Sequence, residues 1–243
     1  MNRKNGIHTV VLVIITLVFS SCIAELFGIT GKGDIISKSC AVSDFQSVTL
    51  NSSANVDIVK GNIFKVEVSD YENLLQYHAV TVSNHTLVIS NVPASTLLNN
   101  SKAKVTITMP DSLIHVTLNG SGDITISSAF KDLLSTDISG SGNINAGQSL
   151  NIAKLNANIY GSGNITATGK VDSLKAVIAG SGNMDFSTLR ANYANCTISG
   201  SGNIDVAVVI TLKATITGSG NVYYYGTPNV NATMSGSGTV IRK

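Results

Sequence analysis

Two aspartates in the second half of the chain have the residue type and the spacing that carboxylate chemistry requires. Asp185 and Asp205 each stand five residues after the first glycine of a Gly-Ser-Gly tripeptide. If these tripeptides mark equivalent points of a repeat, the two carboxylates lie about one strand spacing (~4.8 Å) apart. Such a pair could serve a retaining glycosidase or a calcium site. The equivalent positions of the neighbouring repeats are Thr166 and Tyr223, so no third acid or arginine joins the pair. Solvated surface carboxylates are the simpler interpretation.

Other residue types that carry catalysis are sparse. The only histidines beyond the N-terminal segment are His78, His85 and His115, and the chain has no tryptophan and no Gly-x-Ser-x-Gly nucleophile motif. The serines of the Gly-Ser-Gly tripeptides recur without a base beside them, although a serine nucleophile requires one. No Cys/His spacing indicates a metal site. The sequence therefore predicts no catalytic residue, no cofactor and no metal.

The N-terminal segment is typical of an export signal. Arg3 and Lys4 precede an apolar run over residues 7–19, and two serines then precede Cys22. The apolar run is shorter than the roughly 20 residues that span a bilayer. Small residues before a cysteine resemble the lipobox of bacterial lipoproteins, which makes Cys22 the predicted site of lipidation. Phe19 stands where leucine is usual, so a cleaved signal with an incidental cysteine is the alternative.

This interpretation predicts a lipoprotein-type signal peptide over 1–21 and a tether over 22–36. The protein is then exported and anchored by lipid to the outer membrane, on its periplasmic or cell-surface side. Of the 16 Lys+Arg, two lie before Cys22, whereas none of the 14 Asp+Glu does, so the remaining chain is neutral. Nucleic-acid binders carry clustered basic residues, so nucleic acid is excluded as a partner. Cys40 and Cys196 could form one disulfide in an oxidising compartment, but two free thiols are favoured because Cys196 falls at a small core position of the repeat described next.

A seven-fold repeat dominates the second half of the chain. The first glycines of the Gly-Ser-Gly tripeptides follow one another at intervals of 18 to 21 residues. This period is too short for helical hairpins or propeller blades and matches one coil of a β-solenoid. A phosphate-binding glycine loop would need a following helix, and no helical periodicity follows these tripeptides. The first glycines are Gly120, Gly140, Gly161, Gly180, Gly200, Gly218 and Gly236.

Apolar residues alternate in period two on both sides of each tripeptide, which predicts strands with one buried face. Before the tripeptide the alternation reads large, small, large, and after it one column is apolar without exception. Stacked coils place equivalent residues above one another, so the polar turn residues should form two ladders. The serine ladder is Ser121, Ser141, Ser162, Ser181, Ser201, Ser219 and Ser237. The second ladder is Asp123, Asn143, Asn164, Asn183, Asn203, Asn221 and Thr239. We expect the glycines to supply positive φ at the corner and the asparagines to tolerate it.

The predicted fold class is all-β, a right-handed parallel β-helix (β-solenoid) with about 20 residues per coil and irregular, wider N-terminal coils. Residues 37–243 form its single domain, with irregular coils over 37–118 and Gly-Ser-Gly-Asn coils over 119–243. The irregular part is expected to be continuous with the regular coils and to cap that end, because a solenoid end exposes unpaired strand edges.

Several motifs occur in an order that resembles one known family. DFQSVTL around Phe45 is followed by VDIVKG, KVEVSDYENLL and TLVIS, and then by the serial GSGNI. Together they resemble the putative auto-transporter adhesin head, or GIN, domain family (the DUF2807 group), over nearly everything from about Ser37 onward. The resemblance implies an exported protein with a right-handed parallel β-helix.

Two functions are compatible with these features. The first is a non-enzymatic cell-envelope lipoprotein that displays its β-helix for adhesion, with the membrane, glycans, and envelope or host proteins as partners. The alternative is a carbohydrate-binding or carbohydrate-active protein that uses the Asp185/Asp205 strip. Tyr223, Tyr224 and Tyr225 are expected to cap the last coil, with Tyr224 inward. The last coil could also pair with a second copy of the chain, giving a homo-oligomer through the solenoid ends.

Overall fold

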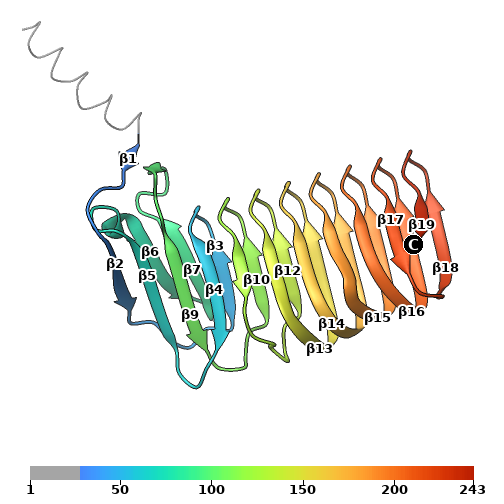
Figure 1. Cartoon of the computed structure of the whole chain (residues 1–243), viewed down its shortest axis with the longest axis horizontal. Coiled ribbons are helices and arrows are strands. Elements are labelled where there is room, and N and C mark those ends of the chain that lie inside the picture. The colour runs from blue at the N-terminus through green and yellow to red at the C-terminus, as the bar shows by residue number, and fades with distance from the viewer. Residues whose placement is uncertain (1–27) are drawn as a thin grey trace, which may run out of the picture.

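The computed structural model describes residues 28–243, which form one elongated solenoid (Figure 1). The predicted signal peptide and Cys22 lie outside the described residues. Within 28–243 the regular secondary structure consists of strands and one 3₁₀ turn, η1 (Leu75–Tyr77). In this part of the chain no helix is long and apolar enough to cross a membrane.

The regular coils are built from parallel strands that carry equivalent residues in register. Ile144 pairs with Ile165, for example, and Leu155 pairs with Leu174. The strands on both sides of the turns are β10 (His115–Leu118), β11 (Ile124–Ile126), β12 (Ser135–Ile138), β13 (Ile144–Ile159), β14 (Ile165–Ile178), β15 (Met184–Ile198), β16 (Ile204–Ile216), β17 (Val222–Tyr225), β18 (Asn229–Met234) and β19 (Val240–Arg242). Every turn projects along one edge of the solenoid (Figure 1). The predicted β-solenoid is confirmed.

The alternating apolar columns form one continuous core along the solenoid. The column after the tripeptides is buried from Ile124 to Val222, and the column before them is buried from Leu118 to Ile216. From β13 to β16 the small column before the tripeptides is buried and holds only alanine or cysteine, for example Ala176 and Cys196, because the interior of a coil is narrow. The last coil differs, since Met234 is 51% exposed at the C-terminal end.

The turn glycines are required by close stacking and not by positive φ, so the expected reason was wrong. None of the Gly-Ser-Gly glycines has positive φ. A Cβ placed on Gly182 would instead lie 1.7 Å from the carbonyl oxygen of Gly163 in the preceding coil. Such an overlap is sterically impossible, so each turn leaves no room for a side chain facing the coil before it.

The N-terminal part differs from the predicted wider coils in the order of its strands. It contains β2 (Ile35–Cys40), β3 (Ser47–Leu50), β4 (Asn55–Lys60), β5 (Lys65–Tyr71), β6 (His78–Ser83), β7 (Thr86–Asn91) and β9 (Lys104–Met109). The first coil in the chain, β3 with β4, stacks between β10–β11 on one side and β7–β9 on the other, all parallel. The chain thus leaves this coil, travels outward and returns to stack beneath it.

Antiparallel strands close this end of the solenoid. β6 pairs with β7, β5 pairs with β9, and β2 pairs with β5, all antiparallel. Asn84 and His85 join β6 to β7 with positive φ at both residues, the conformation of a type I′ hairpin turn. These outer strands cover the backbone groups that the first parallel coils would leave unpaired.

Strand pairing begins within the segment predicted as a tether. β1 (Ile29–Thr30) pairs with β8 (Leu98–Asn99), and β2 begins at Ile35. Lys32 also donates a backbone hydrogen bond to Asn73. Residues 29–36 are therefore part of the folded domain.

Both described cysteines are free. Cys196 lies fully buried between Ala176 and Ala214 of the adjacent coils, and burial raises the pKa of its thiol to about 12. Cys40 is half-buried; burial raises the pKa of its thiol, and the nearby Lys38 opposes this shift.

We therefore expect Cys196 of the native chain to resist thiol reagents at pH 8, because the thiolate is the reactive form. Labelling should appear at Cys40 first and at Cys196 only after unfolding in denaturant. Mass spectrometry of the labelled peptides resolves the two sites. If Cys196 of the native chain were labelled as fast as Cys40, the reagent would have access to the core around Cys196.

Candidate functional sites

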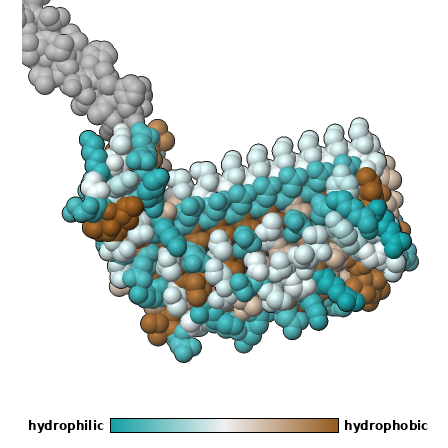
Figure 2. All heavy atoms as spheres, viewed as in Figure 1, coloured by the Kyte–Doolittle hydropathy of each residue, from teal (hydrophilic) through white to brown (hydrophobic). Residues whose placement is uncertain are grey.

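An asparagine ladder runs along the line of turns. The side-chain oxygen of each asparagine accepts two hydrogen bonds from the next asparagine, one from its backbone N–H and one from its Nδ2. Asn164, for example, donates to Asn143 Oδ1 at 3.0 Å from the backbone and at 2.9 Å from Nδ2. The same pattern joins Asn143 to Asp123, Asn183 to Asn164, Asn203 to Asn183 and Asn221 to Asn203. A continuous hydrophilic row lies beside the turns on the face shown in Figure 2.

Two residues of the ladder, Asp123 and Thr239, have no side-chain amide. Asp123 accepts from Asn143 but has no side-chain N–H to donate, and its backbone N–H bonds Asn55 Oδ1 at 3.1 Å. At the other end Thr239 donates its backbone N–H and its hydroxyl to Asn221. The amides thus point head to tail along the solenoid, an arrangement in which hydrogen bonds polarise one another.

Removing one amide in the middle of this ladder should destabilise the coil locally. Asn183→Ala removes the acceptor of both bonds from Asn203. We expect a loss of about 1 kcal/mol in the free energy of unfolding, because Asn183 is exposed and water can replace part of the contact. Denaturant titration measures it, with Ser181→Ala as the matched control. Equal losses in the two variants would show that the ladder adds no stability.

The serines of the ladder predicted beside the asparagines are all exposed. From Ser141 to Ser219 their backbone N–H groups bond the preceding turn, as Ser162 does to the carbonyl oxygen of Gly140 at 3.1 Å. No hydrogen bond from a hydroxyl of this ladder occurs within the described residues. The serine row is therefore a polar outer edge with its hydroxyls directed to solvent.

Asp185 and Asp205 lie in register on β15 and β16, as expected, but they contact different partners. Asp185 Oδ1 accepts hydrogen bonds from the backbone and the hydroxyl of Ser187, the latter at 2.6 Å. Asp205 Oδ1 accepts from Lys243 Nζ at 2.8 Å. Nothing in this geometry directs the two carboxylates onto one ligand, and residues 28–243 contain no group of three or more His, Cys, Asp or Glu side chains placed to hold a metal.

The C-terminal tyrosines and Lys243 form a clasp over the last coils. Tyr224 packs partly buried against the core. Tyr223 and Tyr225 both lie beneath Lys243 Nζ, which is 4.1 Å from the centre of the Tyr223 ring. The hydrogen bond to Asp205 is the main reason that the pKa of Lys243 is raised above its usual value. Tyr223 therefore faces a cation of the same chain, where a stacking ligand would otherwise lie.

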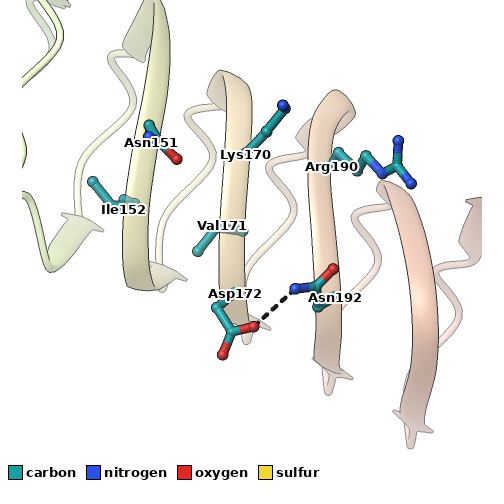
Figure 3. A pocket seen from close by; sticks show the side chains of 7 residues that line it. All are labelled: Asn151, Ile152, Lys170, Val171, Asp172, Arg190 and Asn192. Atoms are coloured by element: carbon teal, nitrogen blue, oxygen red, sulfur yellow. Dashed lines mark hydrogen bonds between the residues drawn. The ribbon is translucent and has the colours of Figure 1, made fainter.

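A polar groove crosses the strands on another part of the surface (Figure 3). It holds about 470 Å³ and is lined by Asn151, Ile152, Lys170, Val171, Asp172, Arg190 and Asn192. Lys170 and Arg190 are paired neighbours on β14 and β15, and their side chains project from the strands on the same side (Figure 3). Asp172 accepts a hydrogen bond from Asn192 at 2.9 Å. We call this hollow the basic groove.

The basic groove lies where the coils are irregular. The register between β14 and β15 shifts between Thr166 and Gly169, and Gly169 has a φ of +118°. Bulges commonly re-aim side chains beside binding sites. The repeat pattern does not reveal these residues, since Lys170 stands nine residues after Gly161 whereas Arg190 stands ten after Gly180. Their shared column therefore has no constant offset from the repeat.

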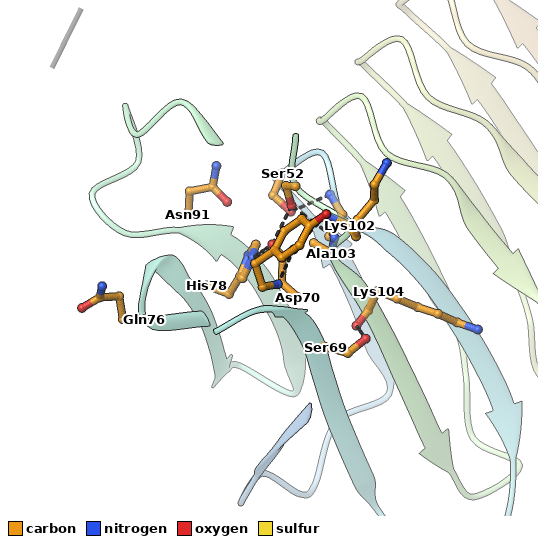
Figure 4. A network of polar contacts seen from close by, with 12 residues as sticks. Ser52, Ser69, Asp70, Gln76, His78, Asn91, Lys102, Ala103 and Lys104 are labelled. Carbon is orange, nitrogen blue, oxygen red and sulfur yellow. Dashed lines mark hydrogen bonds and ion pairs between the residues drawn. The ribbon is translucent and has the colours of Figure 1, made fainter. Parts of the chain in front are cut away.

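A buried carboxylate organises the N-terminal cap (Figure 4). Asp70 is fully buried, and its oxygens accept hydrogen bonds from Ser101 Oγ at 2.6 Å and from His78 Nε2, Lys102 N and Tyr71 N, each at 2.8 Å. Burial alone would raise the pKa of Asp70, but the bonds from Ser101, His78 and the two backbone N–H groups hold the pKa below its usual value.

This cluster contains a serine, a histidine and an aspartate but lacks the arrangement of a catalytic triad. Ser101 donates to the carboxylate and not to the imidazole, whereas a triad serine bonds the histidine. The network instead ties β5, the start of β6 and the loop before β9 to one another. Its role in this structure is to hold the cap.

Comparison with known proteins gives a consistent picture. The family described as putative auto-transporter adhesin, head GIN domain, matches residues 44–228. A putative adhesin from Bacteroides fragilis has a similar structure, with 26% identity and a TM-score of 0.81 over 89% of this chain and 100% of that one. No protein of curated function matches the chain.

Two further structures extend the likeness. A putative lipid binding protein from Parabacteroides distasonis has 25% identity and a TM-score of 0.73 over 88% of this chain and 99% of that one. A putative adhesin from Parabacteroides merdae has 22% identity and a TM-score of 0.75 over 88% and 98%, which shows a shared fold. With three quarters of its length matched by one family, the chain belongs to the putative auto-transporter adhesin head, or GIN, domain family.

Proposed function

We propose that the protein is a non-enzymatic adhesion or interaction module, exported and held at the outer membrane by lipid on Cys22. The observation that carries this proposal is that the inward and outward side chains of the solenoid differ in character. Inward residues form a core along the whole solenoid, while the outward ones form regular polar rows on a rigid frame. Such a frame presents side chains in fixed positions to a large partner.

The separate contacts of Asp185 and Asp205 favour binding over glycan cleavage. A cleaving pair needs both carboxylates at one bond of the substrate. Replacing both residues by asparagine is therefore expected to leave surface attachment unchanged. A glycan-cleaving activity abolished by this double substitution would support the enzymatic alternative.

Anchoring is tested with the full chain expressed from its own signal. The wild-type protein should enter the membrane fraction and incorporate a labelled fatty acid, whereas Cys22→Ser should remain soluble in the periplasm. An equal distribution of both proteins would overturn lipid anchoring. Protease added to intact cells then distinguishes surface display from a periplasmic location.

Attachment is tested with a deletion strain and the same strain complemented by the full chain. Cells that carry the protein should bind better to surfaces coated with extracellular matrix, glycans or envelope preparations. Cys22→Ser serves as the control that keeps the fold but removes the proposed anchor. Identical attachment of all strains would overturn the adhesion role.

A further inference from the structure

The basic groove contains cations without partners. Lys170 and Arg190 make no hydrogen bond or ion pair with their side chains within residues 28–243, although Asp172 lies in the same groove. As neighbours in register on adjacent strands, their backbones lie about 4.8 Å apart. Both side chains project outward (Figure 3). An anion placed between two exposed cations on neighbouring strands can contact both of them.

The groove continues in both directions along the solenoid. On one side Arg190 also lines a hollow of about 260 Å³ that contains Tyr225, with the short side chain of Ala207 leaving room between them. On the other side Ile152 also lines a hollow of about 270 Å³ whose walls carry Lys131, Asp132 and Lys154. The line of hollows crosses successive strands, so a linear polymer could follow it and meet a new side chain at each coil.

The chemistry of the groove favours a polysaccharide over a peptide. An extended peptide usually gains affinity by pairing with a free strand edge, but the strands here are paired on both sides. Sugar hydroxyls can also donate to the carboxylate of Asp172, which is an acceptor beside the two cations. The amides of Asn151 and Asn192 offer further donors and acceptors for hydroxyl groups.

We propose that the basic groove binds a uronate-containing polysaccharide, whose carboxylates contact Lys170 and Arg190 and whose hydroxyls contact the amides and Asp172. This ligand class rests on the proposed interaction function and specifies its partner. Arg190 suits the role because a guanidinium binds a carboxylate through two parallel hydrogen bonds. Tyr225 supplies an aromatic edge at the far end of the line.

The test is a binding titration of the full-length protein with polygalacturonate. We expect saturable binding that weakens with salt, because exposed charge pairs are screened. Lys170→Ala with Arg190→Ala should lower the affinity by about tenfold or more, since each charge-assisted hydrogen bond contributes at least that order. Arg190→Lys should retain part of the affinity.

Charge-matched and ligand-matched controls make the test specific. Lys175→Ala with Lys213→Ala removes two exposed cations that do not line these hollows. The net charge therefore falls by the same amount as in the groove variant, while the groove itself is unchanged. Methyl-esterified polygalacturonate lacks the carboxylates and should bind poorly. The proposal is overturned if wild type does not bind polygalacturonate, if both double variants lose affinity equally, or if polyglutamate binds as tightly.

Attachment assays separate this inference from the proposed function. If cells carrying Lys170→Ala with Arg190→Ala attach like wild type while the purified chain ignores polygalacturonate, the groove proposal fails and the adhesion role stands. If the chain binds polygalacturonate but its deletion leaves attachment unchanged, the groove stands and the adhesion role fails.

Discussion

Gly182→Ala is expected to lower the free energy of unfolding by more than about 3 kcal/mol, a large effect for one methyl group. The new Cβ would lie 1.7 Å from the carbonyl oxygen of Gly163 and 2.9 Å from its carbonyl carbon. Both contacts are with backbone, which cannot rotate aside as a side chain can. The two coils must separate at the turn, so the hydrogen bonds that cross it are strained as well.

The damage should remain local, because each coil of a solenoid contacts only its neighbours. Hydrogen exchange should therefore accelerate most in β14 and β15, whereas the cap strands exchange as in wild type. Denaturant titration gives the loss in free energy. Gly182→Ala with wild-type stability would mean that the coils are stacked less closely than the structure shows.

Two control variants isolate the steric cause. Ser181→Ala changes the adjacent, exposed residue of the same turn and should stay within about 0.5 kcal/mol of wild type. Ala54 occupies the equivalent of the second glycine in the first turn, since Gly122 stacks directly on its carbonyl group. Its Cβ is tolerated because the coil beneath joins its strands by a longer loop, residues 92–103. Ala54→Gly should consequently bring no relief of strain.

The regular coils could be predicted from sequence because one rule repeats. Large and small apolar residues recur at fixed offsets from each tripeptide, and the structure buries them in register, as Ile144 with Ile165. The asparagine positions follow from the same repeat. The pattern shows that the turns require glycine but not why, since positive φ and close stacking both select this residue. The two explanations are distinguished only by the position of the carbonyl oxygen of the neighbouring turn, which the structure provides.

The first residue of the asparagine ladder, Asn55, could not be predicted from the repeat for a related reason. Asn55 belongs to the ladder, but its turn carries Ser52 and Ala54 in place of the two glycines. The sequence indicates a turn here without showing that it stacks under Gly120. Because the strands beneath this turn are joined by the longer loop over residues 92–103 and not by a tight turn, the glycine signal is absent where the ladder begins.

The cap and the groove depend on contacts that no local pattern encodes. Asp70 meets Ser101 across 31 positions of sequence, and the meeting exists only because β7 and β9 return beneath the first coil. The basic groove lies where neighbouring coils differ in length, so that the strand register shifts between them. Both features follow from irregularity in the coils, whereas a sequence repeat reveals only the regular positions.

Asp70→Ala is expected to destabilise the N-terminal cap by about 3–5 kcal/mol. The substitution leaves four hydrogen-bond donors without their acceptor inside the protein, those of Ser101, His78 and two backbone amides. Hydrogen exchange should accelerate in β5 and β6 and leave β14 to β16 unchanged. Asp185→Asn, at an exposed carboxylate, is the control and should stay within about 0.5 kcal/mol of wild type.

The same carboxylate makes the cap sensitive to acid in a defined direction. Because the pKa of Asp70 is lowered in the folded chain, its contribution is complete above the unfolded pKa of about 3.9 and is lost as the pH falls through the folded value. Wild-type cap stability should thus decline below about pH 4. Asp70→Asn keeps the shape but cannot titrate, so it should be less stable at pH 7 and lose less on acidification. Parallel acid slopes in wild type and Asp70→Asn would assign the effect to other carboxylates, whereas converging curves place it at Asp70, whose four hydrogen bonds join the outer strands to the solenoid.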